Sequence, residues 1–359
     1  MRFAAAPVYQ VFPTVERPLK PYAAAVRATG ETRALIRDFD PELVVADILT
    51  VAAALAAECE ERPWVTLVPH VLPYHEAGLP PYSVGAMRPR TRIGAGLWSL
   101  VRPLLSSGER RGREELNGAR ARVGLPPFEH LHGGISRHLA LVATFPQLEY
   151  PRRWEPWMRV TGPLLWEEPL GDTEPPPGDD PLVLIAPSTT QDPDQHMLRA
   201  ALKGLANEPV RVLASTNRRS TTEALRPPAN AKLVEWISYA RTMPRCAVVV
   251  GHAGHGTVAR TLASGVPMVA VPAGGDQPEN AARIRWAGCG ISLPRRFVTP
   301  RGIRLAVRRL LADERLARRA AELGRWASAN DGAAMAADVV EELADQAGAA
   351  PLAPSAESP

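Results

Sequence analysis

The sequence predicts an α/β protein built from two doubly wound domains. Short apolar runs, typical of buried parallel strands, recur along the chain and alternate with helical stretches rich in alanine, leucine and arginine. The 359 residues, 45% of them hydrophobic, are enough for two separate cores. A segment with a triple proline and several acidic residues, at 166–181, divides the chain and predicts an interdomain linker.

The two halves differ in the number of strands that they offer. In the second half we expect strands at 182–187, 210–215, 232–236, 247–252 and 268–273, which suffice for a full parallel sheet. The first half offers three convincing strands, at 43–47, 65–69 and 139–144. An ordinary doubly wound domain has about two further strand–helix units, on the order of 60 residues, so we expect the first domain to be incomplete at its start.

The predicted boundaries follow from this organisation. The first domain takes residues 1–165, the linker 166–181 and the second domain 182–345, and a frayed tail takes 346–359. We expect the C-terminal helix after residue 314 to cross back and brace the first domain.

Composition excludes several classes of protein. The net charge of +4 and the pI near 9.2 come from arginines that are spread along helices among acidic residues, so no nucleic-acid-binding arm is expected. The three cysteines lie far apart and suit a reducing cytoplasm. No apolar run approaches the roughly 20 residues of a transmembrane helix, and the opening lacks the order of a signal peptide. We therefore expect a soluble, cytoplasmic protein.

The most informative stretch, 248–288, reads as strand, glycine-rich turn, helix, strand, turn and helix. Gly251, Gly254 and Gly256 let the backbone turn sharply and approach a ligand, and Thr257 begins a helix whose free N–H groups favour an anion. The stretch lacks the P-loop lysine and the spacing of the dinucleotide fingerprint, so ATPase and dehydrogenase functions lose support. The pattern predicts a cradle for a diphosphate.

Polar and aromatic residues around this cradle have two interpretations each. His252 ends a strand and can bond a phosphate oxygen, and a purely structural histidine is less favoured in this turn. Asp276 and Gln277 begin the next helix and suit sugar hydroxyls, although Asp276 can also serve as the N-cap. Trp236 ends a strand and can stack on a flat base, although an isolated tryptophan is more often a core residue.

Four segments carry a resemblance to a known family: VTGPLLWEEP, LIAPST, EWISYARTMPRCAVVVGHAGHGT and GVPMVAVPAGGDQPENAARI. They resemble the glycosyltransferases of the UDP-glucuronosyl/glucosyltransferase type (family 1), in particular bacterial ones that glycosylate macrolides and other natural products. The resemblance covers nearly the whole second half. It implies two Rossmann-like domains of the GT-B type, with the acceptor side first and the donor side second.

The resemblance also implies roles for individual residues. Trp236 would stack on the donor's pyrimidine, and the backbone of Ile237 would bond the edge of that base. Asp276 and Gln277 would bind the sugar. The diphosphate would be held by Ser188, His252, Gly254, Gly256 and Thr257.

One position departs from the family pattern. The family usually has a glutamate that grips the ribose hydroxyls, and this chain has Arg260. The change replaces an acceptor with a donor. Either the ribose is held in another way or the donor differs, for instance a deoxythymidine-linked sugar.

The implied reaction is inverting transfer of a hexose from a UDP- or dTDP-sugar to a hydroxyl of a lipophilic small molecule. Its general base is a histidine oriented by an aspartate. Asp47 matches the orienting position, but an aspartate that caps the helix near Thr50 is an equally good interpretation. No matching histidine is found, and His70 and Tyr74 are expected on the acceptor side, with His70 a weaker candidate for a substitute base.

Two other functions remain open. A catalytically impaired protein that binds a nucleotide sugar, or that assists a partner glycosyltransferase, fits the missing histidine. A nucleotide-sugar 2-epimerase would need an acidic cluster that the sequence does not offer. No metal and no cofactor beyond the nucleotide sugar are expected, because His130, His132 and His138 fit no zinc spacing and no DxD-like pair lies near the cradle.

Overall fold

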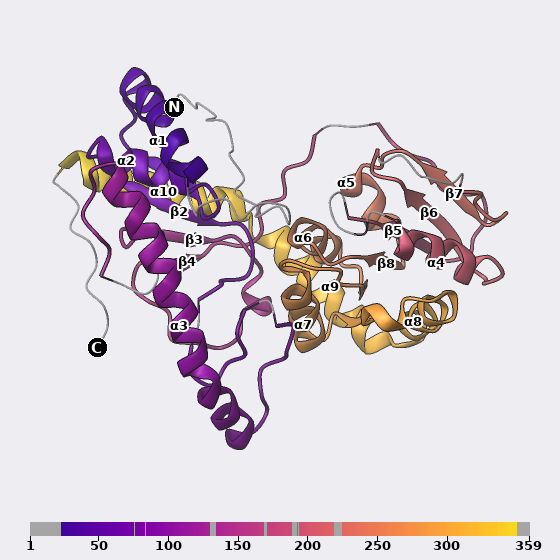
Figure 1. Cartoon of the computed structure of the whole chain (residues 1–359). Helices are drawn as coiled ribbons and strands as arrows, with labels where there is room; N and C mark the ends of the chain where they lie inside the picture. Colours follow the sequence, from indigo (N-terminus) through magenta and orange to yellow (C-terminus); the bar gives the residue numbers. More distant parts are fainter. Residues whose placement is uncertain are drawn as a thin grey trace.

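The structure, a computed structural model, describes residues 23–349 with gaps. The gaps are residues 75, 83, 130–133, 169–170, 189–191, 193 and 219–224, and the side chains of 23, 101–109, 348 and 349 are also outside the description. His130, His132 and most of the predicted tail therefore lie outside the described residues. Two parallel sheets lie on either side of the 166–181 segment, in two lobes (Figure 1).

The first sheet has the strand order β1-β2-β3-β4 and is parallel throughout. Its strands are β1 (Val44–Asp47), β2 (Trp64–Val68), β3 (Ala140–Val142) and β4 (Met158–Val160). The helices of this half are α1 (Ala23–Phe39), α2 (Val51–Cys59) and α3 (Arg92–Arg122), with a 3₁₀ turn η1 (Pro146–Leu148). The sequence did not predict β4, because a three-residue strand with an exposed arginine in its middle carries no clear apolar pattern.

The second sheet has the order β10-β9-β8-β5-β6-β7 and is also parallel. Its strands are β5 (Leu182–Ala186), β6 (Arg211–Ser215), β7 (Ala231–Val234), β8 (Val248–Gly251), β9 (Met268–Ala270) and β10 (Gly290–Ser292). The helices are α4 (His196–Leu205), α5 (Tyr239–Thr242), α6 (His255–Ala263), α7 (Gln277–Ala287), α8 (Pro300–Ala312) and α9 (Glu314–Ala329), with 3₁₀ turns η2 (Met243–Arg245) and η3 (Arg295–Phe297). Strand order reverses at β5, so a crevice for a ligand is expected beyond the carboxyl ends of β5 and β8.

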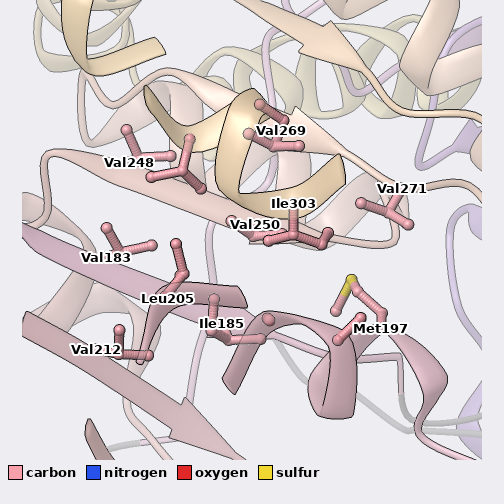
Figure 2. Close-up of a cluster of buried hydrophobic side chains, with 14 of the residues drawn as sticks. Val183, Ile185, Met197, Leu205, Val212, Val248, Val250, Val269, Val271 and Ile303 are labelled. Atoms are coloured by element: carbon pink, nitrogen blue, oxygen red, sulfur yellow. The ribbon is translucent and has the colours of Figure 1, made fainter. Parts of the chain in front are cut away.

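The core of the second domain explains why its strands can be predicted from the sequence. Val183 and Ile185 of β5 point to the face that α4 and α8 cover, where they meet Met197 and Ile303 (Figure 2). The alternate residues of β5 pack on the opposite face against another buried cluster. Because both faces are covered, every position of such a strand is apolar, and the strand appears as a continuous apolar run.

The last helix, α10 (Gly332–Ala349), leaves the second domain and packs on the first sheet. Its residues Ala336, Val340 and Leu343 lie in one cluster with residues of β2 and β3, and Figure 1 shows the yellow helix among the elements of the first lobe. The crossing needs glycine, since a Cβ added at Gly332 would lie 2.7 Å from the Gly162 carbonyl carbon. Helix α10 therefore contributes to the core of the first domain.

Candidate functional site

Two helices begin at the same edge of the second sheet. α6 follows β8 after a short turn, and α7 follows β9 after the segment 271–276. The start of α7 faces the first domain, because a Cβ added at Gly85 would lie 2.8 Å from the Cβ of Pro278. The start of α6 faces it as well, because His255 lies near His70. The free N–H groups at the start of each helix therefore lie on the side of the second domain that faces the first.

His252 connects the first of these turns to α4. Its Nδ1 lies 2.9 Å from the Val271 carbonyl oxygen, and its Nε2 lies 3.3 Å from Oδ2 of Asp192. Asp192 also accepts the backbone N–H groups of His196 and Met197, each at 3.0 Å, and so caps α4. Burial favours a raised pKa for Asp192, but His252 and the two N–H groups outweigh it and lower the pKa to about 2.

The glycines of the turn serve two different purposes. A Cβ at Gly251 would lie 2.9 Å from the Ala186 carbonyl oxygen, so this glycine lets β8 pack beside β5. A Cβ at Gly254 or Gly256 would meet nothing within 4 Å. Gly254 also has an ordinary φ of −59°, so the chain itself does not require glycine there. The open space lies over the first turn of α6, where Thr257 is half-buried.

A single asparagine ties the two turns together. Nδ2 of Asn280 donates to the Ala253 carbonyl at 2.9 Å and to Oδ2 of Asp276 at 2.7 Å. Asp276 occupies the N-cap position of α7, but its side chain makes no capping hydrogen bond. Sequence reasoning missed Asn280, although its position one helical turn after Asp276 is a signal that it can reach the same place.

Gln277 stiffens the loop that precedes α7. Its Oε1 accepts the backbone N–H of Ala273 at 2.8 Å and that of Gly274 at 3.3 Å. The side chain is 5% exposed. The side-chain oxygen of Gln277 is therefore already bonded to the loop.

Trp236 lies in the turn after β7, two residues beyond the strand's last residue, Val234, whereas the predicted strand ended at Trp236 itself. It is 38% exposed rather than buried in the core. The guanidinium of Arg218 lies 4.7 Å from its ring centroid. The next residue, Ile237, is buried in the core that includes Leu184 and Val249. Ser188 is half-buried, two residues after β5. These residues surround the carboxyl edge of the sheet on the α5 side.

Arg260 is engaged with the linker. Its Nη2 donates to the Leu165 carbonyl, and its Nε lies 3.9 Å from Oε2 of Glu167. The same Glu167 oxygen accepts the N–H of Ala240 at the start of α5, at 2.9 Å. Arg260 thus holds the linker against α6.

On the first domain, Asp47 ends β1 beside Leu67 of β2. Its Oδ1 accepts the N–H of Leu49 at 2.8 Å. The N-cap of α2 is Thr50, whose hydroxyl donates to the Asp47 carbonyl at 2.8 Å. The Asp47 carboxylate therefore stabilises the turn before α2 rather than capping the helix.

His70 follows β2 and lies against Tyr82. Its Nδ1 is 2.8 Å from the Val71 carbonyl oxygen and 3.5 Å from the Tyr82 hydroxyl, with 5.9 Å between the ring centroids. Tyr74, farther along the same loop, packs beside the core of the first domain, and its carbonyl accepts a hydrogen bond from Arg152 at 3.1 Å.

Side chains of the two domains meet at this point. Burial raises the pKa of Tyr82, and the neighbouring carboxylates of Asp276 and Glu279 raise it further. Burial lowers the pKa of His255 to about 4, and the nearby His70 lowers it as well. The backbone of Ala143 and the side chain of Asn280 lie beside the His255 ring, but among the described residues neither ring nitrogen has a partner in hydrogen-bond geometry. Sequence reasoning missed Tyr82 and His255, although His255 stands in the same glycine-rich turn as His252.

The sequence and the fold of the chain are similar to those of known proteins. Residues 201–345 match the family described as Erythromycin biosynthesis protein CIII-like, C-terminal domain. The chain is 29% identical over 322 residues to 4'-demethylrebeccamycin synthase of Lentzea aerocolonigenes, covering 86% of this chain and 76% of that protein. It is 31% identical over 250 residues to O-mycaminosyltylonolide 6-deoxyallosyltransferase of Streptomyces fradiae, covering 65% of this chain and 57% of that protein.

Residues 201–345 therefore resemble the C-terminal domain of this family, and the relatives named above are glycosyltransferases of natural-product biosynthesis. Solved structures agree on the fold. The glycosyltransferase of kitacinnamycin superposes with a TM-score of 0.73 at 20% identity and covers 94% of this chain and 86% of its own. The glycosyltransferase VinC in complex with DTDP has a TM-score of 0.66 at 20% identity and covers 92% and 78%. The predicted GT-B arrangement of two Rossmann-like domains is confirmed.

Within the described part of the chain, no group of three His, Cys, Asp or Glu residues is placed to hold a metal ion. Over the same residues, no helix has the length and apolar character needed to cross a membrane.

Proposed function

We propose that the chain transfers a hexose, with inversion, from a UDP- or dTDP-sugar to a hydroxyl of a lipophilic small molecule. The observation that carries the proposal is the bridge through Asn280, which joins the turn before α6 to Asp276 at the start of α7. The bridge places an anion-favouring helix start beside a carboxylate that accepts sugar hydroxyls. The diphosphate and the sugar of a nucleotide sugar would then both have binding groups at one edge of the sheet.

The donor's diphosphate would lie over the first turn of α6. The open space at Gly254 and Gly256 admits phosphate oxygens to the free N–H groups, with Thr257, His252 and Ser188 around them. The helix dipole would stabilise the charge that develops on the departing diphosphate, in the place that a metal ion takes elsewhere. Exposed Trp236 would stack on the base, and the Ile237 backbone would bond the edge of that base.

The sugar would lie between the two helix starts. Asp276 would accept from its hydroxyls, and the amide nitrogen of Gln277 would donate to them, because the Gln277 oxygen is already bonded to the loop. The mixed donor and acceptor pair would read the stereochemistry of neighbouring hydroxyls.

The acceptor would approach from the first domain, past His70 and Tyr74, with Asp47 orienting the general base. Position alone supports this part, since His70 and Tyr82 face His255 and Asp276 across the domain boundary. A proton on Nδ1 of His70, directed at the Val71 carbonyl, would leave Nε2 unprotonated and able to take a proton. The relatives act in natural-product biosynthesis, which supports a lipophilic acceptor. The three cysteines of this chain are free thiols, which supports the cytoplasm as the site of reaction.

The second candidate function is nucleotide-sugar binding without transfer, by the chain alone or beside a partner glycosyltransferase. One observation favours it. The Asp47 carboxylate bonds its own turn, and among the described residues no histidine contacts it.

Two measurements separate these functions. Calorimetric titration with UDP and dTDP tests the donor site, and release of nucleoside diphosphate from UDP- and dTDP-sugars, with a panel of lipophilic alcohols, tests transfer. Release together with an NMR coupling constant of the inverted anomer supports the proposal. Binding without release supports the second function, and failure of both nucleotides to bind contradicts both. In the same titration, an Arg260→Glu variant that leaves the ratio of UDP to dTDP affinity unchanged would reject a role for Arg260 in donor choice.

A further inference from the structure

The first half of α3 presents an apolar stripe to solvent. Ile93, Leu97 and Leu100 are 80%, 61% and 76% exposed, and their spacing places them on one face of the helix. The opposite side is occupied, since a Cβ added at Gly78 would lie 3.3 Å from the Cβ of Ala95. Figure 1 shows this half of α3 extending beyond the sheet of its lobe.

The second half of α3 packs against the first domain, and this packing sets the direction of the helix. Leu116 and Ala119 are buried, and the guanidinium of Arg120 forms a two-bond pair with Glu58 of α2 at 2.8 Å. The exposed stripe is therefore carried on a rigid element anchored in the first domain. A helix of 31 residues is about 46 Å long, which is enough for one half to be anchored while the other projects.

The sequence around the stripe, between Glu76 and Glu109, carries only basic charges. Residues 77–108 contain arginines at 88, 90, 92 and 102 and no lysine, aspartate or glutamate. The net charge of this segment is therefore +4, which equals the net charge of the whole chain, so the rest of the chain is neutral in sum. Arg90 and Arg92 are exposed directly before the stripe.

We propose that the α3 surface, formed by Arg90, Arg92, Ile93, Leu97 and Leu100, lies on the surface of a membrane that contains anionic phospholipids. Apolar side chains beside arginines fit the boundary between acyl chains and anionic headgroups. The apolar side chains contact the acyl chains, and the arginines contact the headgroups. The charge selects an anionic surface, and a protein partner would have to supply both a groove and several carboxylates. The helix would lie in the plane of the interface, and the domains would stay in water.

The test is co-sedimentation of the full chain with vesicles of phosphatidylcholine alone and of phosphatidylcholine mixed with phosphatidylglycerol. We expect binding to the mixed vesicles that falls as salt is raised. Arg90→Gln with Arg92→Gln should weaken this binding roughly thirtyfold at low salt, from about 1 kcal/mol for each arginine. Ile93→Gln with Leu97→Gln and Leu100→Gln should weaken it at every salt concentration.

A matched set of changes on α8 controls for surface charge and apolar area. Arg301→Gln, Leu305→Gln and Arg309→Gln also alter exposed residues, and this variant should bind vesicles as the unaltered chain does. Circular dichroism confirms that each variant is folded. The proposal is wrong if the unaltered chain binds neither vesicle, or if the α3 and α8 variants bind equally. A chain that sediments as a dimer, and as a monomer after the Ile93, Leu97 and Leu100 changes, would make the stripe a contact between copies instead.

Discussion

Nε2 of His252 lies 3.3 Å from Oδ2 of Asp192, so the end of β8 is joined to the cap of α4. The folded-state pKa of Asp192 is lowered from 3.8 to about 2, so its stabilisation is present above pH 4 and is lost as pH falls toward 2. We expect Asp192→Asn to cost about 2 kcal/mol of the free energy of unfolding at pH 7 and to flatten its pH dependence between about 4 and 2.

Urea unfolding at a series of pH values measures this effect. Asp331→Asn is a matched control, because Asp331 accepts the N–H groups of Ala333 and Ala334 at the start of α10 without this histidine. An equal change of the pH dependence in both variants would show that helix capping alone is responsible.

His255 should make stability depend on pH in a higher range. Its pKa is lowered from 6.5 to about 4 by burial first and by His70 second, so the unfolded chain binds more protons between these values. Stability should therefore fall by about 3 kcal/mol as pH drops from 6.5 to 4. His255→Leu should remove most of this fall in urea unfolding, whereas His196→Leu should retain it. A His255→Leu variant with the native pH dependence would contradict the assignment.

Asn280 should position the proposed sugar site. Asn280→Ala leaves the buried Ala253 carbonyl without its donor and should cost about 1–3 kcal/mol of stability. It should also weaken binding of a nucleotide sugar more than binding of the free nucleotide, because it releases Asp276. Calorimetric titration with both ligands measures the difference.

Asn230→Ala is the control for this prediction. Nδ2 of Asn230 donates to the carbonyls of Leu205 and Val210, each at 2.9 Å, away from the helix starts. It should lose comparable stability and keep the affinity for both ligands. Equal losses of affinity in the two variants would mean that Asn280 acts through stability alone.

Trp236 should contribute to nucleotide affinity by stacking. Trp236→Ala should weaken binding of UDP and dTDP by roughly 5- to 150-fold, because stacking on one base contributes about 1–3 kcal/mol. Trp166→Ala removes a tryptophan that is 85% exposed in the linker and should leave the affinity unchanged. Unchanged affinity in Trp236→Ala, measured by the same titration, would remove Trp236 from the site.

Arg283 joins the two domains through buried charges. Its Nε lies 2.8 Å from Oε1 of Glu279 and its Nη1 lies 3.5 Å from Oε2 of Glu149, and all three side chains are 3% exposed. Arg283→Met leaves two buried carboxylates with less compensation and should cost about 3–5 kcal/mol. Arg308→Met breaks a pair with Glu208 whose arginine is 60% exposed and should cost less than Arg283→Met. Scanning calorimetry that finds similar melting temperatures for the two variants would contradict the prediction.

Much of the fold could be predicted from local patterns of apolar residues in the sequence. The runs at β5, β6 and β8 are apolar at nearly every position because helices cover both faces of a parallel sheet. β4 and β10, at three residues each, are defined by their pairing with β3 and β9, and three residues are too few to show a period. Strand β7 is also short, at four residues, and Trp236 was predicted inside it although the strand ends at Val234.

The sequence by itself determined the glycine-rich turn, the residues His252, Asp276 and Gln277 at one sheet edge, and the linker, because each depends on a few residues that are adjacent in sequence. Tertiary structure decided which distant groups meet there. Asn280 joins two turns, Arg260 turns to the linker, and His70 with Tyr82 faces His255 from another domain. These contacts depend on how α6, α7 and the first domain pack, and that packing is set by the burial of whole surfaces, which no local spacing of residues records.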